Sequence, residues 1–249
     1  MTAERITGKN NPLLSHVRKL RDSRAYRREC GEFMAEGWKL LDEALKWYPR
    51  LKTVLFCEGA ELPPLPPEVR AVELPASLLD SLSAMKTPQG VLFTAALPPV
   101  SELELRAGML LLDRIQDPGN LGTILRTADA FGIPVVLTNG CADPFSEKTI
   151  RASMGAVLRT PVQSGEMEKI LAQCAEKHIP IAATALTPQA EDLRAVPLRE
   201  MLTVIGSEGQ GICQTLLEAS QRQIIIPMQP RCESLNAAIA AAIVMWEMQ

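Results

Sequence analysis

The stretch MLLLDRIQDPGNLGTILRTADAFGIPVVLTNG, residues 109–140, decides the fold of this chain. The apolar run MLLLD has the length of a buried strand, and residues 121–131 carry their apolar side chains at helical spacing. A second apolar run, VVLT, follows directly, so the chain alternates strand, helix and strand. Strands that are apolar on both faces are typical of a parallel sheet covered by helices. The stretch therefore predicts an α/β domain.

The same alternation continues to the end of the chain. We expect helices at 146–154, 167–177, 213–221 and 235–247, and strands at IAAT (181–184), LTVIG (202–206) and QIIIP (223–227). In open α/β sheets, ligands bind at the carboxyl ends of the strands. We therefore expect the chemistry in the loops that follow these strands.

The first hundred residues predict a second, smaller α/β domain. Its expected helices lie at 11–28, 31–48 and 77–85, and its strands at 53–57, 70–74 and 91–95. The proline cluster LPPLPP (62–67) can be neither helix nor central strand, and Pro98 with Pro99 marks a linker. These features predict one domain at residues 1–98 and a second at 99–249.

Charge is distributed unevenly along the chain. The net charge of the 249 residues is −3, yet residues 1–28 carry eight basic side chains against two acidic ones. Such a segment either contacts a polyanion or forms a solvated helix face, and charge alone leaves both interpretations open.

Composition excludes other classes of protein. The six cysteines include no CxxC pair and there are two histidines, so neither a zinc site nor a disulfide framework is expected. The N-terminus lacks an apolar signal core, and the longest apolar stretch, 235–246, is too short to cross a membrane. The sequence therefore predicts a reduced, cytoplasmic protein without a metal and without a membrane partner.

The segment 113–132 contains the first unusual strand-to-helix junction. Its DPGN turn can lead into a helix, with Asn120 as the candidate N-cap. Leu121, Leu125 and Ala128 share one helix face and should pack on the sheet. Arg126 falls instead beside the small residues Thr123 and Ala130, so it is either an ordinary surface arginine or a site residue.

Two further junctions follow. In VIGSEGQGI (204–212), three glycines indicate backbone that turns sharply or lies against a ligand. The order GxxGxG and the acidic Glu208 do not fit a dinucleotide loop. In IIIPMQPRCESLNAAIAAAIVMW (224–246), a buried strand runs through a polar loop to Ser234, the candidate N-cap of an alanine-rich helix. That thin helix permits close approach to another element, through ordinary helix packing or at a site.

Taken together, the three segments resemble the three signature motifs of the SpoU (TrmH) branch of the SPOUT methyltransferases, in the same order and at compatible spacing. The segment GCADPFSEKTIRASMGA (140–156) looks like the stretch between that family's first two motifs, and residues 6–45 look like its substrate-binding extension. One departure is Pro230, where members commonly have glycine.

This resemblance implies an RNA ribose 2′-O-methyltransferase that uses S-adenosylmethionine and works as a homodimer through its catalytic domain. It implies a C-terminal SPOUT α/β trefoil-knot methyltransferase domain with a smaller N-terminal α/β substrate-binding domain. The large N-terminal module favours ribosomal RNA over transfer RNA as the substrate. By motif position, the expected cofactor contacts are Thr184, Leu186, Gly206, Ile226, Met228 and Leu235.

Arg126 matches the family's catalytic arginine. A guanidinium, with its pKa above about 12, is a poor general base. We therefore expect Arg126 to hold the target phosphate and stabilise the developing alkoxide. The remaining polar motif positions, expected to orient the arginine, shape the cofactor loop and meet the nucleotide, are Asn120, Glu208, Ser234 and Asn236.

The basic first helix is expected to position RNA through phosphate contacts that do not read sequence. Helical spacing brings together the four strongest candidates, Arg21, Arg24, Arg27 and Arg28. Two other functions compete with ribose methylation: a non-catalytic RNA-binding protein that kept the fold, and a SPOUT enzyme that methylates a base nitrogen. The serine–leucine–asparagine triplet and the first motif favour ribose.

Overall fold

The chain forms two compact units in a computed structural model, which describes residues 3–100, 102–207, 209–229, 231–232 and 234–249. The N-terminal unit comprises residues 1–99 together with Phe145–Arg159, and the C-terminal unit comprises Val100–Pro144 and Thr160–Gln249. The division predicted between residues 98 and 99 did not anticipate that Phe145–Arg159 packs with the N-terminal unit.

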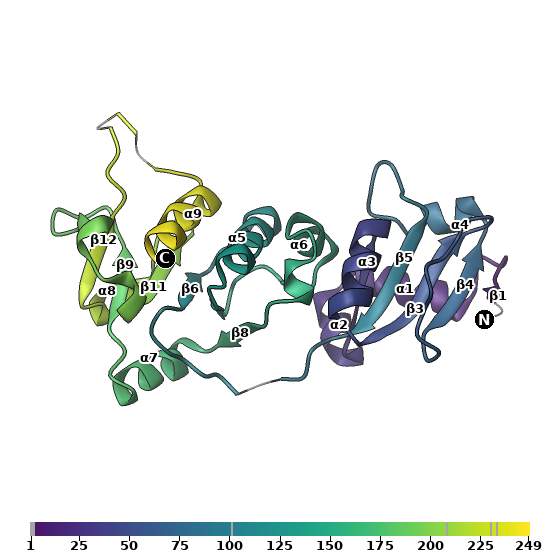
Figure 1. Ribbon diagram of the computed structural model, residues 1–249, viewed down its shortest axis with the longest axis horizontal. Helices are drawn as coiled ribbons and strands as arrows, with labels where there is room; N and C mark the ends of the chain where they lie inside the picture. Colours follow the sequence, from purple (N-terminus) through teal and green to yellow (C-terminus); the bar gives the residue numbers. More distant parts are fainter. Residues whose placement is uncertain (1–2, 101, 208, 230, 233) are drawn as a thin grey trace. The chain divides into compact units, whose positions relative to one another are not determined.

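The described residues of the N-terminal unit form a five-stranded sheet in the order β1-β4-β3-β5-β2 (Figure 1). Strand β3 pairs parallel with β4 and antiparallel with β5, and β5 pairs antiparallel with β2. The strands are β1 (Glu4–Arg5), β2 (Glu32–Glu36), β3 (Leu51–Cys57), β4 (Arg70–Leu74) and β5 (Val91–Ala96). The helices are α1 (Pro12–Asp22), α2 (Arg24–Cys30), α3 (Trp38–Trp47), α4 (Ala76–Asp80), α6 (Glu147–Ala152) and the 3₁₀ helix η1 (Ala156–Leu158).

Strand β2 corrects the helix that was predicted over residues 31–48. Gly31 and Gly37, with φ of 63° and 115°, bracket the strand and stop a helix from running through it. Phe33 and Met34 are buried and point to opposite faces of the sheet. Phe33 contacts the ring of Phe145, which precedes α6, while Met34 joins the core beneath α1. Burial on both faces and pairing with β5 outweigh the helical spacing, so helix α3 begins only at Trp38.

The single helix predicted over residues 11–28 is also wrong, because Ser23 divides it into α1 and α2. Ser23 has φ −125° and ψ 113°, and its hydroxyl accepts a hydrogen bond from the Tyr26 backbone N–H at 3.1 Å. Serine stabilises a helix better as an N-cap than in the interior, since it satisfies an N–H that otherwise has no partner.

Within the described part of the C-terminal unit, seven strands pair in parallel in the order β10-β12-β9-β11-β6-β7-β8, which confirms the predicted parallel α/β sheet. The strands are β6 (Leu110–Asp113), β7 (Val135–Thr138), β8 (Val162–Gly165), β9 (Ile181–Thr184), β10 (Glu191–Asp192), β11 (Leu202–Gly206) and β12 (Arg222–Ile225). The helices are α5 (Pro118–Phe131), α7 (Met167–Glu176), α8 (Gln214–Ala219), α9 (Ala237–Glu247) and the 3₁₀ helices η2 (Leu193–Ala195) and η3 (Leu198–Glu200).

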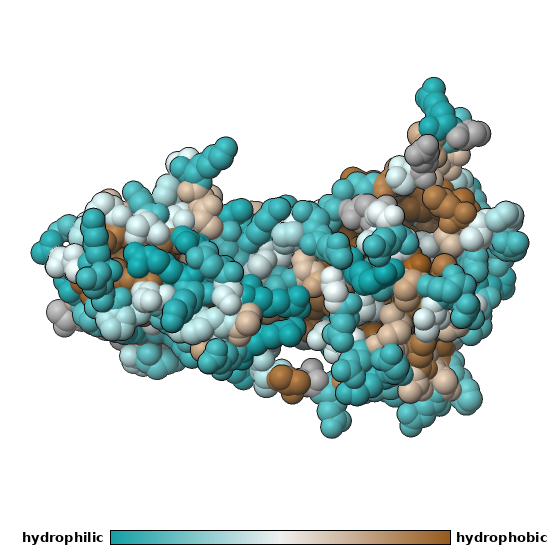
Figure 2. Space-filling view, turned by 180° about the vertical axis from the view of Figure 1, so that it is seen from behind, coloured by the Kyte–Doolittle hydropathy of each residue, from teal (hydrophilic) through white to brown (hydrophobic). Residues whose placement is uncertain are grey.

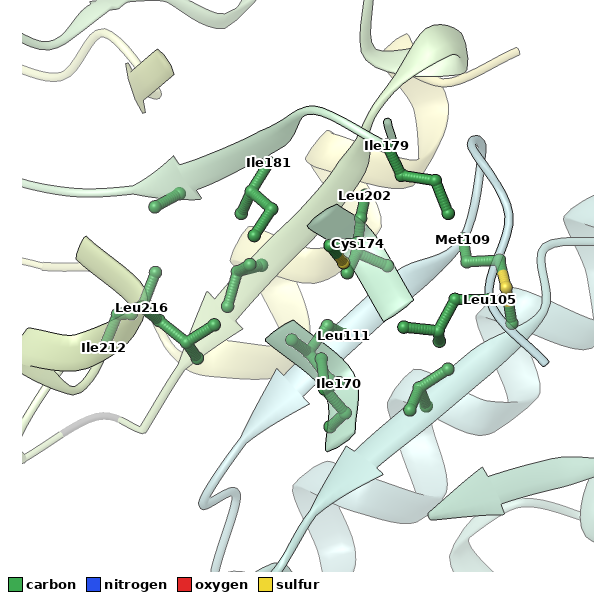
Figure 3. Close-up of a cluster of buried hydrophobic side chains, with 13 residues drawn as sticks. Leu105, Met109, Leu111, Ile170, Cys174, Ile179, Ile181, Leu202, Ile212 and Leu216 are labelled. Atoms are coloured by element: carbon green, nitrogen blue, oxygen red, sulfur yellow. The ribbon is translucent and has the colours of Figure 1, made fainter. Parts of the chain in front are cut away.

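Helices α7 and α8 pack on the sheet through one apolar cluster (Figure 3). Ile170 and Cys174 of α7 and Leu216 of α8 meet Leu111 of β6 and Val204 of β11. Helix α9 packs beside α5 and contacts β11. The face of α5 predicted to be buried is buried, with Leu121, Leu125 and Ala128 each at most 1% exposed. None of the described helices has the length and apolar character needed to cross a membrane.

Candidate functional site

A pocket of about 320 Å³ lies at the carboxyl ends of β9 and β12 in the C-terminal unit. Its volume falls in the range of about 300–1,000 Å³ that is usual for small-molecule sites. Figure 2 shows hydrophobic surface gathered in a hollow at the base of the protruding loop between β12 and α9, at the upper right. The described residues that line the pocket are Thr184, Ala185, Leu186, Thr187, Gln210, Gly211, Ile212, Leu217, Ile224, Ile225, Ile226, Met228, Ser234, Leu235 and Ala240.

Most of the predicted cofactor contacts meet in this pocket. They come from separate segments of the chain, the end of β9 and the loop between β12 and α9, and comprise Thr184, Leu186, Ile226, Met228 and Leu235. The walls are mainly isoleucine, leucine and methionine side chains, with threonine hydroxyls at one side. A ligand with an apolar face and a few polar atoms fits walls of this composition. Their role in cofactor binding stays a prediction.

Gly206, the sixth predicted contact, supports the pocket without lining it. A Cβ atom on Gly206 would lie 2.3 Å from the carbonyl carbon of Gly211, closer than any real contact. The backbone of Gly211, which does line the pocket, therefore packs directly against Gly206. The turn that contains the glycines at 206, 209 and 211 is called the glycine loop. Ser207 and Gly211 close it through two backbone hydrogen bonds of 3.2 and 2.9 Å.

Helices α5 and α9 begin with caps other than those predicted. Asp117 caps α5, and its Oδ1 accepts from the Asn120 backbone N–H at 2.8 Å, so Asn120 lies inside the first turn. Proline at the first helical position is favourable because it has no N–H to satisfy, which moves the start of the helix to Pro118. Asn236, not Ser234, caps α9, and its Oδ1 accepts from Ala238 N–H at 2.9 Å.

The structure joins the first and third sequence motifs through one side-chain hydrogen bond. Asn236 Nδ2 donates to Asn120 Oδ1 at 3.0 Å, between the N-terminal ends of α9 and α5. Ser234, two residues before Asn236, lines the pocket. The sequence named all three residues as polar site candidates, and the structure places them along one path from α5 to the pocket.

Arg126 lies on α5 with its side chain exposed, beside the exposed Thr123 and Ala130. It does not line the pocket, and no hydrogen bond or ion pair joins it to another described residue. A guanidinium in this setting is accessible to an anion from solution. Glu208, also predicted to take part in the site, lies outside the described residues, as does Pro230.

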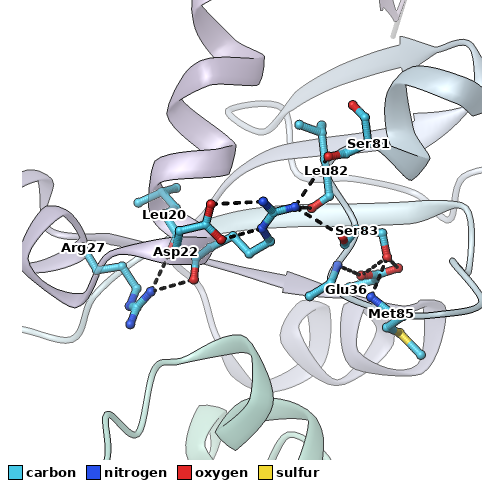
Figure 4. Close-up of polar contacts among 10 residues, drawn as sticks. Leu20, Asp22, Arg27, Glu36, Ser81, Leu82, Ser83 and Met85 are labelled. Carbon is cyan, nitrogen blue, oxygen red and sulfur yellow. Dashed lines mark hydrogen bonds and ion pairs between the residues drawn. The ribbon is translucent and has the colours of Figure 1, made fainter.

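Two of the four predicted RNA-binding arginines donate hydrogen bonds to backbone carbonyl groups of the N-terminal unit, and Figure 4 labels one of them, Arg27. Arg21 donates to the carbonyl oxygens of Leu82 and Ser83 at 3.1 and 3.3 Å. Its hydrogen bond to the Asp22 carboxylate raises the pKa of Arg21. Arg27 is 5% exposed, and its Nη1 donates to the Leu20 carbonyl oxygen at 2.5 Å.

The predicted common face of four arginines is therefore wrong. The chain turns at Ser23 between α1 and α2, and burial removes Arg27 from any contact with RNA. Arg24 and Arg28 are exposed, so for these two the phosphate contact stays a prediction.

Sequence reasoning missed a polar cluster at the carboxyl end of β6. Asp113 is fully buried, and it accepts hydrogen bonds from the Thr138 hydroxyl at 3.1 Å and the Cys213 backbone N–H at 2.8 Å. Burial raises the pKa of the Cys213 thiol, which is thus uncharged at neutral pH. The signal was present, since an aspartate ends the otherwise apolar run MLLLD. Among the described residues, no group of three or more His, Cys, Asp or Glu side chains could hold a metal ion.

Comparison with known proteins agrees with this architecture. The sequence profile of the SpoU rRNA Methylase family matches residues 108–246, and that of the MRM3-like substrate binding domain matches residues 11–93. The chain is 31% identical over 225 residues to the 23S rRNA (guanosine(2553)-2'-O)-methyltransferase RlmP of Bacillus subtilis, covering 90% of each protein.

Solved structures are similar along nearly the whole chain. A TrmH-family protein from Porphyromonas gingivalis is 35% identical, with a TM-score of 0.83 over 95% of this chain and 96% of that one. An AdoMet-bound rRNA methyltransferase from Sinorhizobium meliloti is 28% identical, with a TM-score of 0.85 over 99% of this chain and 97% of that one. The fold is thus that of the SPOUT methyltransferases, with a substrate-binding unit before the catalytic one. The profile match spans more than half of the chain, and the chain belongs to the SpoU rRNA methylase family.

Proposed function

We propose that this chain transfers a methyl group from S-adenosylmethionine to a ribose 2′-hydroxyl of ribosomal RNA. The observation that carries the proposal is the pocket made by the second and third motifs, which the Asn236–Asn120 hydrogen bond connects to the helix of Arg126. RlmP, a relative that spans the chain, is a 23S rRNA 2'-O-methyltransferase by name, and the structure from S. meliloti is AdoMet-bound. Both support this substrate and this cofactor.

The residues present fit the cofactor. Apolar side chains such as Ile226 and Leu235 can contact its adenine and methylene groups, and threonine hydroxyls with backbone atoms can meet its polar atoms. S-adenosylmethionine, when bound, supplies an electrophilic methyl group and needs no metal. Gly206 lets the backbone pack closely in this wall of the pocket, and Gly211 allows the backbone to turn with a φ of +63°.

The residues of the first motif would act on the RNA. Arg126 would hold the phosphate beside the target ribose and stabilise negative charge as the hydroxyl loses its proton. Asn120 and Asn236 would keep the start of α5 next to the pocket wall. A water or a phosphate oxygen would take the proton, because a guanidinium is too weak a base. The trefoil knot, the homodimer and the cytoplasmic location also stay predictions.

Cofactor binding is the first expected result. The folded chain should bind S-adenosylmethionine in isothermal titration calorimetry carried out in a metal chelator, because the pocket is built of backbone and apolar groups. A folded sample that shows no heat of binding at millimolar ligand would favour the non-catalytic RNA-binding alternative. Mapping ribose methylation across total RNA from cells with and without the protein would then identify the nucleotide and distinguish ribose from base methylation.

RNA binding should depend on the exposed basic residues of α2. Replacing Arg24 and Arg28 together by glutamine should weaken RNA binding and flatten its salt dependence. Each lost phosphate contact lowers the number of counterions released on binding, and with it the slope, by roughly one. The slope of log affinity against log salt concentration measures this effect. The matched control is the Arg194→Gln variant, since Arg194 is an exposed arginine paired with Asp192 in the C-terminal unit. Equal slopes for the double variant and the wild type would mean that this face is only solvated.

A further inference from the structure

Arg114, directly after β6, has an unusual backbone and a fixed side chain. Its φ is +55°, in the left-handed region that a residue with a long side chain rarely adopts. Such a conformation persists only where the surroundings hold it. Its side chain is 30% exposed, and its backbone N–H donates to the Thr138 hydroxyl at 3.1 Å. A Cβ atom at Gly140 would lie 3.2 Å from Arg114 Cγ, so the glycine leaves room for this arginine.

The guanidinium of Arg114 connects β6 to the glycine loop. Nη1 donates to Gln210 Oε1 at 2.9 Å, and Nη2 donates to Asp113 Oδ2 at 3.3 Å. The same Asp113 oxygen accepts the Cys213 backbone N–H at 2.8 Å. Arg114 Nε is buried and has no hydrogen-bond partner among the described residues, an unfavourable state that the Nη contacts offset.

These contacts bracket one wall of the pocket. Gln210, Gly211 and Ile212 line the pocket, and they are attached to the sheet at Gln210 through Arg114 and at Cys213 through Asp113. The attachment at Gln210 is a charge-assisted hydrogen bond, which is about twice as strong as a neutral one. Loss of the Arg114 side chain would free the Gln210 side chain, while the Ser207–Gly211 backbone hydrogen bonds and the Asp113–Cys213 contact would remain.

We propose that Arg114 is a positioning residue for the cofactor, acting through Gln210 to hold residues 210–212 against the pocket. This inference rests on the proposed function, since it assigns a role to the same pocket. Arg114 does not line the pocket and makes no contact with the cofactor in this role. It sets the affinity for S-adenosylmethionine by fixing the wall before the ligand arrives.

The experiment measures the Kd of S-adenosylmethionine by calorimetry for Arg114→Gln, Gln210→Ala and the double variant. Each single variant should raise Kd severalfold, because the contact is exposed to solvent and acts on the ligand only by ordering the wall. The double variant should be no weaker than either single variant, because both remove the same contact. Arg114→Lys should bind more tightly than Arg114→Gln, since an ammonium can still donate to Gln210 while a neutral amide makes a weaker contact. The control is Arg194→Gln, with unchanged Kd.

The possible results separate the two proposals. If the folded wild type binds no S-adenosylmethionine, the proposed function fails. If the wild type binds while Gln210→Ala has unchanged affinity, the positioning role is overturned, and this holds even if Arg114→Gln does not fold, because the Gln210 side chain is exposed. Additive effects of the two substitutions would also overturn it, since they would show that Arg114 acts on general stability and not through Gln210.

Discussion

Replacing Arg126 by alanine is expected to reduce methyl transfer about a thousandfold, because removal of one group that stabilises developing negative charge costs about 10²–10³ in rate. The affinity for S-adenosylmethionine should stay unchanged, since Arg126 lies on α5 and does not line the pocket. Transfer of a labelled methyl group to ribosomal RNA from cells that lack the protein measures the first quantity, and calorimetry measures the second.

Arg126→Lys tests whether the planar shape of the guanidinium matters in addition to its positive charge. An ammonium lacks the planar fork that binds two phosphate oxygens at once, so the lysine variant should also be slow. Arg222→Ala is the matched control, because Arg222 is an exposed arginine at the start of β12 that pairs with Glu191. A lysine variant with most of the wild-type rate would contradict the role given to the guanidinium.

The second large effect is expected for Gly206→Ala. The added methyl group would lie 2.3 to 2.5 Å from backbone atoms of Gly211 and Ile212, and backbone cannot move aside as a flexible side chain can. Such overpacking costs about 2 kcal/mol, or about thirtyfold in a binding constant. The wall of the pocket formed by Gly211 and Ile212 should move outward, so the Kd of S-adenosylmethionine rises.

Gly209→Ala is the control for this substitution. Gly209 belongs to the same loop, yet a Cβ atom there would meet nothing within 4 Å. The control variant should bind the cofactor like the wild type. Thermal unfolding without the ligand shows whether Gly206→Ala distorts only the loop or lowers the stability of the whole C-terminal unit. Wild-type affinity together with wild-type stability would mean that the loop is not packed as described.

Much of the C-terminal sheet could be predicted from the sequence because its signals are local. The runs IAAT and LTVIG form strands with the predicted bounds, since each is a short apolar run between polar segments. The segment 32–36 could not be recognised in this way. Its strand is specified by pairing with β5, about sixty residues further along the chain, while its own side chains continue a helical spacing.

The same distinction applies to the site. The resemblance to the family identified Asn120 and Asn236 as site candidates, because its motifs are short and local in sequence. Their hydrogen bond joins residues 116 positions apart, and Arg114 meets Gln210 across 96 positions. Neither contact follows from residue types or spacing, because both depend on how parallel strands bring distant loops to one edge of the sheet.

The segment Phe145–Arg159 has a consequence for how this protein is made. The chain passes between the two units three times, so the N-terminal unit contains residues synthesised after the first part of the C-terminal unit. On the ribosome, the N-terminal unit stays incomplete until Arg159 has emerged, and the face of β2 at Phe33 stays without its partner Phe145 until then. A gene fragment ending at Pro99 therefore lacks Phe145, the aromatic partner of Phe33, and the contacts that α6 makes with β2.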